Sequence, residues 1–347
     1  MKDFLWGVVG VNAQDVNLAR ESGIEWTRLS FSMPFEDRMH GRLTKSYVEA
    51  RAQAEALHRN GMKILGVTPL PFHSRWEPDD NGILQLKSRP GLPEWAGPIG
   101  SETYNKGYEE ICAWLADNLR GIVPVWQIAN ELDIDLFAGP LTPRQCCEFI
   151  EHGAQGLKRA DPSLLVGHTP AGDPEAYFLY GWLYGRGKPL LDFCGVDGYY
   201  GTWQAGGPEN WAKRICELSE LTGVPVLVCE WGFSSGGELM PEGELPPIIY
   251  SPLCQERKWW HTWGPGHTPQ GQAQFIREGF KVFRAHREKL LGAFYFRWKD
   301  AETCWQCGSK ECPIETHWGL LDADGKIKPS LAAYTEGVAM MKAMQTP

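Results

Sequence analysis

The chain has 347 residues, of which 43% are hydrophobic and 22% are charged. This apolar content is too high, and the charge too low, for a disordered chain. The formal net charge of −9 argues against a nucleic-acid partner, because phosphate backbones are bound by basic surfaces. No apolar run approaches the roughly 18 residues that a membrane span needs, so we expect a globular protein with no membrane partner.

The beginning of the chain shows no export signal. Met1 to Phe4 leads directly into an apolar stretch, without the basic segment, long apolar run and small-residue cleavage site of a signal peptide. The chain also contains no Asn-x-Ser/Thr acceptor for N-glycosylation. We therefore expect a cytoplasmic protein, with a secreted protein that has lost its signal as the alternative.

Short apolar runs rich in Val, Ile, Phe and Tyr alternate along the chain with longer amphipathic stretches. The apolar runs are expected as strands and span residues 4–9, 24–31, 62–68, 122–129, 163–168, 193–199, 225–230 and 292–298. The amphipathic stretches are expected as helices near residues 14–22, 44–60, 104–119, 142–159, 174–185, 208–222, 269–288 and 329–344.

Strands that alternate with helices predict βαβ units and a parallel sheet, which is an α/β fold. Eight such units without a break in composition predict a single (β/α)₈ (TIM) barrel domain over residues 1–347. A doubly wound open sheet is the alternative, but no G-x-G-x-x-G motif follows the first strand. Three connections, 69–103, 231–268 and 299–328, are much longer than the roughly 2–6 residues of ordinary βα loops, which is typical of loops that build a substrate cleft.

Two of the expected strands end in a glutamate. Asn130-Glu131 follows the fourth strand, and Glu230-Trp231-Gly232 ends the seventh. The C-terminal ends of barrel strands form the catalytic rim, so both carboxyl groups are expected at one cleft. Two carboxyl groups that flank a bond are what glycoside hydrolysis requires. The alternative is that each glutamate only stabilises the N-terminus of the next helix.

These motifs resemble those of the clan A glycoside hydrolases, retaining (β/α)₈ enzymes that include families 5 and 39. The likeness runs from Phe4 to about Tyr334. It implies that Glu131 is the acid/base and Glu230 the nucleophile of a double displacement through a covalent glycosyl-enzyme. It also implies a carbohydrate substrate, such as a β-glucan or β-mannan oligo- or polysaccharide, and no cofactor for catalysis.

The same resemblance implies several substrate-binding residues. Arg28 is expected to hold Glu230 ionised, Asn130 to bond the 2-hydroxyl of the sugar, and Tyr199 to touch the nucleophile. Asp197 shares one strand face with Tyr199, at a position where the clan more often has His or Asn. This extra carboxylate would either raise the pKa of a neighbouring acid or bind a substrate hydroxyl. The further candidates are His73, His168 and Trp298. Phe296 is the alternative to Trp298 as the floor of the subsite for the reacting sugar.

Two other functions use the same features. A non-catalytic carbohydrate-binding barrel would keep the tryptophans and lose one of the glutamates. An exo-acting β-glycosidase on short glycosides would keep both glutamates, and its loops 69–103 and 231–268 would close a pocket instead of an open groove. The sequence defines neither the sugar nor the oligomeric state.

Four of the ten cysteines form a spaced pattern. Cys304 and Cys307 make a Cys-x-x-Cys motif, Cys312 follows in the same connection, and Cys254 lies in the connection after the seventh strand. Four thiols of this spacing suit a tetrahedral structural zinc that would pin two long loops together. Disulfides are the alternative in a secreted protein, and the missing export signal favours zinc.

Overall fold

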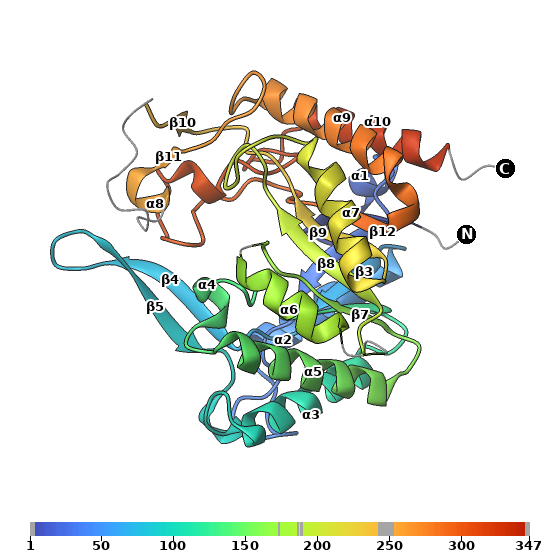
Figure 1. Ribbon diagram of the computed structural model, residues 1–347, viewed down its shortest axis with the longest axis vertical. Coiled ribbons are helices and arrows are strands. Elements are labelled where there is room, and N and C mark those ends of the chain that lie inside the picture. The colour runs from blue at the N-terminus through green and yellow to red at the C-terminus, as the bar shows by residue number, and fades with distance from the viewer. Residues whose placement is uncertain (1–3, 173, 186, 188–189, 242–252, 344–347) are drawn as a thin grey trace.

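The fold is a closed parallel barrel in a computed structural model that describes residues 4–172, 174–185, 187, 190–241 and 253–343. Eight strands pair in the order β1-β12-β9-β8-β7-β6-β3-β2 and close on themselves (Figure 1). These strands are β1 (Leu5–Val9), β2 (Trp26–Ser30), β3 (Lys63–Val67), β6 (Val125–Ile128), β7 (Leu165–His168), β8 (Phe193–Gly198), β9 (Val226–Trp231) and β12 (Leu290–Tyr295). The predicted (β/α)₈ barrel is confirmed, and closure of the sheet excludes the open doubly wound alternative.

Helices follow the barrel strands in turn and cover the outside of the barrel (Figure 1). They are α1 (Val16–Glu21), α2 (Lys45–Arg59), α3 (Glu102–Asn118), α5 (Pro143–Ala160), α6 (Pro174–Tyr184), α7 (Asn210–Thr222), α9 (Pro269–Ala285) and α10 (Pro329–Lys342). The start of α5 contains residues that are typical of a helix N-terminus. Thr142 and Gln145 bond each other's backbone N–H groups in a capping box, and Pro143 occupies the first turn.

Two apolar layers hold the barrel together. Side chains from the barrel strands fill its interior, and among them Phe294 of β12 lies against Gly7 of β1, where a Cβ atom would come within 2.2 Å of the ring. The opposite faces of the strands pack against the helices in a larger core. This alternation of inward and outward residues leaves the ends of the strands as the place where polar groups gather. No helix within the described ranges is long and apolar enough to cross a bilayer.

The long connections carry additional short elements on the side where the barrel strands end. The hairpin of β4 (Phe72–Pro78) and β5 (Leu84–Pro90) extends beyond the barrel (Figure 1). The other short elements of these connections are η1 (Glu94–Ala96), α4 (Asp135–Ala138), β10 (Glu238–Leu239), α8 (Leu253–Glu256), β11 (Lys258–Trp259) and η3 (Pro313–Glu315). The turn η2 (Arg287–Lys289) lies at the other end of the barrel, directly before β12.

The eighth barrel strand differs from its predicted span of 292–298. It covers Leu290–Tyr295, and its register against β9 shifts between Ala293 and Tyr295. Phe296 and Trp298 therefore lie beyond the end of the strand, and the predicted period-two alternation of side chains does not extend to them.

Close packing of α5 against α3 generates a first prediction. A Cβ atom at Gly156 of α5 would lie 2.1 Å from the backbone oxygen of Glu109. We expect Gly156→Ala to lower the free energy of unfolding by about 1–3 kcal/mol, because the helices must separate. The measurement is chemical denaturation. The matched control is Gly181→Ala in α6, where a Cβ atom meets nothing within 4 Å. This control is expected to be neutral or stabilising by up to about 1 kcal/mol, and equal losses in both variants would contradict the prediction.

Candidate active site

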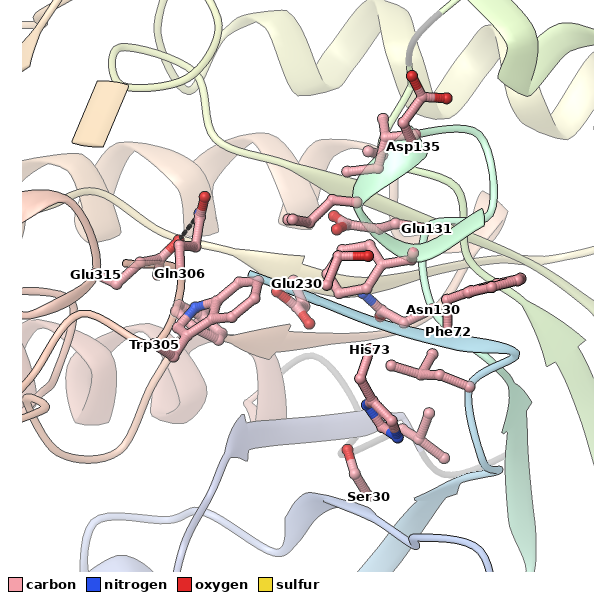
Figure 2. Close-up of a pocket in the computed structure, with 18 of the residues that line it drawn as sticks. Ser30, Phe72, His73, Asn130, Glu131, Asp135, Glu230, Trp305, Gln306 and Glu315 are labelled. Atoms are coloured by element: carbon pink, nitrogen blue, oxygen red, sulfur yellow. Dashed lines mark hydrogen bonds between the residues drawn. The ribbon is translucent and has the colours of Figure 1, made fainter. Parts of the chain in front are cut away.

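A cavity of about 820 Å³ opens at the C-terminal ends of the barrel strands. Its floor contains residues from the ends of β2, β3, β6, β8 and β9, and its walls come from the hairpin, α4 and the connection after β12. Figure 2 shows Glu131 and Glu230 near its centre, with Trp305, Gln306 and Glu315 on one side. The volume lies in the range of roughly 300–1,000 Å³ that small-molecule sites occupy.

Glu230, on β9, is held by two donors. Its Oε1 lies 2.5 Å from Nη1 of Arg28 on β2, and its Oε2 accepts a hydrogen bond from the hydroxyl of Tyr199. The other donors of Arg28 are also used: Nε bonds Oε1 of Gln127 at 2.8 Å and Nη2 bonds Oδ1 of Asn130 at 2.5 Å. All of these contacts favour Glu230 as a carboxylate with a fixed orientation.

The turn after β6 places the other glutamate. Ala129 and Glu131 both have positive φ angles, 51° and 45°, in the left-handed region that non-glycine residues seldom adopt. Hydrogen bonds from both sides hold this backbone: Ala129 N–H donates to Oγ1 of Thr68 at 2.9 Å, and Glu131 N–H donates to the oxygen of Thr169 at 2.8 Å. The strained turn directs Glu131 to the cavity, as is common at functional sites.

The two glutamates lie in different electrostatic surroundings. Burial, and then the negative charges of Glu230 and Asp133, raise the pKa of Glu131 well above the usual range of a carboxyl group. The raised pKa favours the protonated form of Glu131, while the neighbouring Glu230 is paired with Arg28. Two carboxyl groups in such different environments are the arrangement in which one acts as an acid and the other as a base or nucleophile.

Asp197 lies in the barrel behind the cavity and is not among the residues that line it. It is opposite Glu230 in the register of β8 and β9, which shifts just before it. Neither carboxyl oxygen has a hydrogen-bond partner within the described part of the chain. Burial, followed by the charges of Glu230 and Glu131, raises its pKa well above the usual range. Asp197 therefore lies outside the cavity lining, and its expected contact with a substrate hydroxyl stays a prediction.

The two predicted histidines have different positions. His73, on β4, lines the cavity, and burial lowers its pKa. His168 is buried at the end of β7, outside the lining, and its Nδ1 lies 2.7 Å from the oxygen of Ile128. Burial lowers the pKa of His168 to about 4, so it is neutral at pH 7. The structure thus gives His168 a position in the barrel wall, because its ring is turned to the neighbouring strand.

Trp298 is also outside the lining of the cavity. Its indole N–H donates to Oδ2 of Asp15 at 2.9 Å, and the ring is fully buried. Phe296 lines the cavity instead, together with Tyr199, whose ring it meets edge to face at 5.8 Å. Of the two rings expected for the floor of this subsite, the structure thus places Phe296 at the cavity and Trp298 outside its lining.

Sequence reasoning did not identify Glu315 as a site residue. It lines the cavity, accepts a hydrogen bond from Nε2 of Gln306 at 2.6 Å and bonds the side chain of Trp305. Burial raises its pKa to about 8. The Trp305 ring stacks on Phe137, with centroids 5.9 Å apart. These residues lie in irregular connections, where no periodic pattern marks the inward positions.

The structure brings together the four cysteines of the spaced pattern. The sulfur atoms of Cys254, Cys304, Cys307 and Cys312 all lie within 4.8 Å of one another. They are next to the wall that carries Trp305 and Gln306, and they are separate from the two glutamates. This buried group has the composition of a metal-binding site.

Comparison with solved structures shows the same fold in several glycoside hydrolases. The protein is similar to GH5_18 from Streptomyces cattleya in complex with GlcNAc, with a TM-score of 0.67 at 16% identity over 99% of this chain and 82% of that chain. The Thermobacillus composti GH10 xylanase matches with a TM-score of 0.62 at 17% identity, over 96% of this chain and 97% of that chain. The Ignisphaera aggregans GH53 catalytic domain matches with a TM-score of 0.63 at 18% identity, over 96% and 95% of the two chains.

The chain therefore has the (β/α)₈ barrel of the clan A glycoside hydrolases, and the resemblance drawn from the strand-end motifs is confirmed in the fold. At these identities the likeness concerns the fold alone. No protein-family model matches the chain. No curated protein sequence matches it either.

The environment of Asp197 generates a second prediction. A raised folded-state pKa means that the folded protein keeps a proton that the unfolded chain releases above about pH 4. Wild-type stability therefore falls as pH rises from there to the folded-state pKa, and Asp197→Asn removes this loss. We expect the variant to gain on the wild type by up to about 1.4 kcal/mol per pH unit between about pH 4 and 7 in denaturation experiments.

A matched control for this prediction is Asp161→Asn. Asp161 is half-buried, and hydrogen bonds from Ser163 lower its pKa, so it is ionised in both folded and unfolded chains through the upper part of that range. Its curve should run parallel to the wild type between about pH 5 and 7. If the stability curve of Asp197→Asn also ran parallel to that of the wild type, the buried carboxyl group of Asp197 would not keep its proton in this pH range.

Proposed function

We propose that the protein is a retaining glycoside hydrolase that cleaves β-glycosidic bonds in uncharged oligo- or polysaccharides of the β-glucan or β-mannan type. The barrel of residues 1–347 is its catalytic domain. The observation that supports this most is the pair Glu131 and Glu230, which face one cavity and differ in their surroundings, since Glu230 is paired with Arg28 and the pKa of Glu131 is raised. A binding protein without catalysis has no need of this difference.

The reaction proceeds in two displacements. Glu230 attacks the anomeric carbon while Glu131 gives its proton to the departing oxygen, so one C–O bond forms to the enzyme as the glycosidic bond breaks. Glu131, now a carboxylate, takes a proton from a water molecule. The water oxygen attacks the same carbon, the bond to Glu230 breaks, and Glu131 is again protonated.

Neighbouring side chains orient these groups. Arg28 and Tyr199 fix the attacking carboxylate through the contacts described above. Oδ1 of Asn130 already accepts from Arg28 and from Nε2 of Gln127, at 2.5 and 3.0 Å. Its amide NH₂ group is left to donate to a sugar hydroxyl, and this fits the expected contact with the 2-hydroxyl group.

The lining of the cavity favours neutral sugars. Among the described lining residues, Arg28 is the only lysine or arginine, and its donors are occupied. Carboxyl groups outnumber it, so a uronic acid would meet unfavourable charge. Aromatic side chains offer flat surfaces for the apolar faces of sugar rings. The aromatic lining residues are Phe31, Phe72, Trp76, Phe137, Tyr199, Trp203, Phe296, Trp305 and Trp318.

One observation favours the exo-acting alternative, in which the enzyme acts on short glycosides or chain ends. Phe137 follows β6 and Trp305 follows β12, which lie on opposite sides of the barrel. Their rings nevertheless stack on each other across the rim. The N–H of Trp76 in the hairpin also donates to the oxygen of Gln306 at 2.8 Å. Contacts between opposite walls close a groove into a pocket.

The nucleophile assignment predicts the outcome of azide rescue. On aryl β-glucosides and β-mannosides, Glu230→Ala should lower kcat/KM by at least three orders of magnitude, about 4 kcal/mol of transition-state stabilisation. Azide should restore turnover in Glu230→Ala with an α-glycosyl azide as product, and in Glu131→Ala with a β-glycosyl azide. The products are distinguished by NMR.

The control for azide rescue is Glu302→Ala, an exposed glutamate outside the cavity lining, which should keep wild-type activity. Activity in Glu230→Ala equal to that of the control would remove Glu230 from the reaction. Absence of hydrolysis by the wild type across aryl glycosides, β-glucans and β-mannans would contradict the proposed function.

The raised pKa of Glu131 predicts the pH dependence. The acid form is the active one, so kcat/KM for an alkyl glycoside should fall as pH rises through the raised pKa, well above the usual range of a carboxyl group. Glu131→Gln should abolish this alkaline limb and slow alkyl glycosides far more than a dinitrophenyl glycoside, whose leaving group needs no proton. An alkaline limb that persists in Glu131→Gln would assign it to another group.

A further inference from the structure

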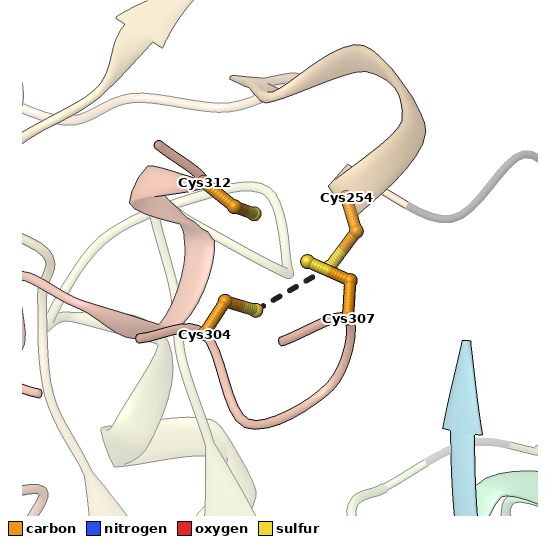
Figure 3. A group of neighbouring side chains, drawn as sticks. All are labelled: Cys254, Cys304, Cys307 and Cys312. Carbon is orange, nitrogen blue, oxygen red and sulfur yellow. Dashed lines mark hydrogen bonds between the residues drawn. The ribbon is translucent and has the colours of Figure 1, made fainter. Parts of the chain in front are cut away.

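The side chains of the four cysteines converge on one point (Figure 3). Two of them flank Trp305 and Gln306, which line the candidate active site. Cys254 belongs to α8, in the connection after β9, and the other three belong to the connection after β12. Cys254, Cys304 and Cys312 are buried, and Cys307 is half-buried. Two connections that leave neighbouring barrel strands therefore meet at this point.

The distances fit a tetrahedron of sulfur atoms around one ion. Sγ of Cys254 and Sγ of Cys304 are 3.7 Å apart. Four sulfur atoms bound to zinc at about 2.3 Å lie about 3.8 Å apart along each edge of the tetrahedron. A disulfide brings only two sulfur atoms together, at about 2.05 Å, and gives no reason for all four to lie within 4.8 Å of one another.

The backbone forms a tight turn at the Cys-x-x-Cys motif. Gly308 follows the motif with a φ of 75°, and its N–H donates to the oxygen of Cys304 at 2.7 Å. This turn folds the segment back on itself, so that Cys304 and Cys307 both contribute a sulfur atom to the cluster.

We propose that these four thiolates bind one zinc ion and that this ion fixes the wall of the cavity formed by Trp305, Gln306 and Glu315. Binding releases the four thiol protons to solvent and leaves no open coordination position, so the role of the ion is structural. The consequence for substrate binding rests on the function proposed above, whereas metal binding and its effect on the wall do not.

The wall is connected to the metal ligands through the chain itself. Trp305 and Gln306 are the two residues between Cys304 and Cys307, and Glu315 lies three residues after Cys312. The bond from Gln306 to Glu315 spans the two halves of this segment. The segment contains only the short η3 turn as regular structure, so the ion replaces the backbone ladder that a helix or strand would provide.

The hairpin is attached to the same assembly. Trp76 N–H bonds the oxygen of Gln306 at 2.8 Å, and Leu84 N–H bonds Oε1 of Gln255 at 2.9 Å. Trp76 and Leu84 also pack against the apolar cluster that surrounds the cysteines. One ion thus holds three connections of the barrel, and the aromatic side of the cavity depends on all three.

Metal analysis of the purified full-length protein tests whether the four cysteines bind a zinc ion. We expect one zinc ion per chain, and cobalt substitution should give the visible absorption of tetrahedral thiolate-bound Co²⁺. Cys307→Ser should reduce the zinc retained against a chelator roughly tenfold or more. The matched control is Cys216→Ser on α7, a cysteine of similar half-buried exposure that lies outside the cluster and should retain the ion. Stoichiometric iron, or disulfides among the four cysteines in a metal-free protein, would overturn the proposal.

Hydrogen exchange tests whether the zinc ion fixes the wall of the cavity, and it does so without any assay of activity. Removal of zinc should accelerate amide exchange in residues 72–90, 253–259 and 300–318, while the barrel strands stay protected. Unchanged exchange in these segments would overturn the role of the ion in the wall. If glycosides are hydrolysed, zinc removal should raise KM more than it lowers kcat. If the protein binds zinc and hydrolyses no glycoside, the zinc site stands and the proposed function is contradicted. If it hydrolyses glycosides and binds no zinc, the proposed function stands and the zinc site is contradicted.

Discussion

The buried ion pair between Arg28 and Glu230 is the interaction on which the rest of the site depends. A charge buried in a barrel is destabilising unless it is paired and hydrogen-bonded. Arg28 satisfies this condition by bonding three side chains, which come from β9, from β6 and from the turn after β6. A single guanidinium on β2 therefore couples three strands, and it orients one carboxylate and the amide of Asn130 in the same set of contacts.

The charge held by Arg28 has consequences for the other acids nearby. Glu131 and Asp197 both have raised pKa values, because burial disfavours their charged forms and the negative charge of Glu230 adds to this effect. In the proposed mechanism the raised pKa lets Glu131 donate a proton, whereas at Asp197 it lowers the stability of the folded protein as the pH rises. Together with the left-handed backbone at Ala129 and Glu131, this places several unfavourable features at the mouth of a well-packed barrel, as is usual where function competes with stability.

The fold and the two glutamates could be predicted because each depends on a regular pattern. Eight alternations of strand and helix define the barrel. Each glutamate stands at the end of an apolar run in the sequence, so its position at the C-terminal end of a barrel strand could be predicted. The cysteine cluster was also predictable, since ligand spacing is local. Trp298 lies beyond the end of β12, because that strand ends at Tyr295 and not at residue 298, and Asp197 lies outside the cavity lining although it is near the end of β8. Where a strand ends depends on hydrogen bonds to its neighbours, which a sequence does not display. Glu315 was missed because its connection has no period at all.

The cavity is thus formed by two kinds of structure, which are held in place by different interactions. The barrel strands place Glu131, Glu230 and Arg28 through a continuous ladder of backbone hydrogen bonds, which tolerates little movement. The aromatic wall has no such ladder, and its position follows from side-chain contacts among three connections and from the cysteine cluster that joins two of them. In the proposed enzyme, the carboxyl groups at the barrel floor catalyse the reaction and the wall contacts the substrate. The wall can be reshaped without moving the carboxyl groups, so substrate recognition can change without a change in catalysis. An irregular wall then needs a cross-link of its own, and four convergent thiols supply the ligands for one.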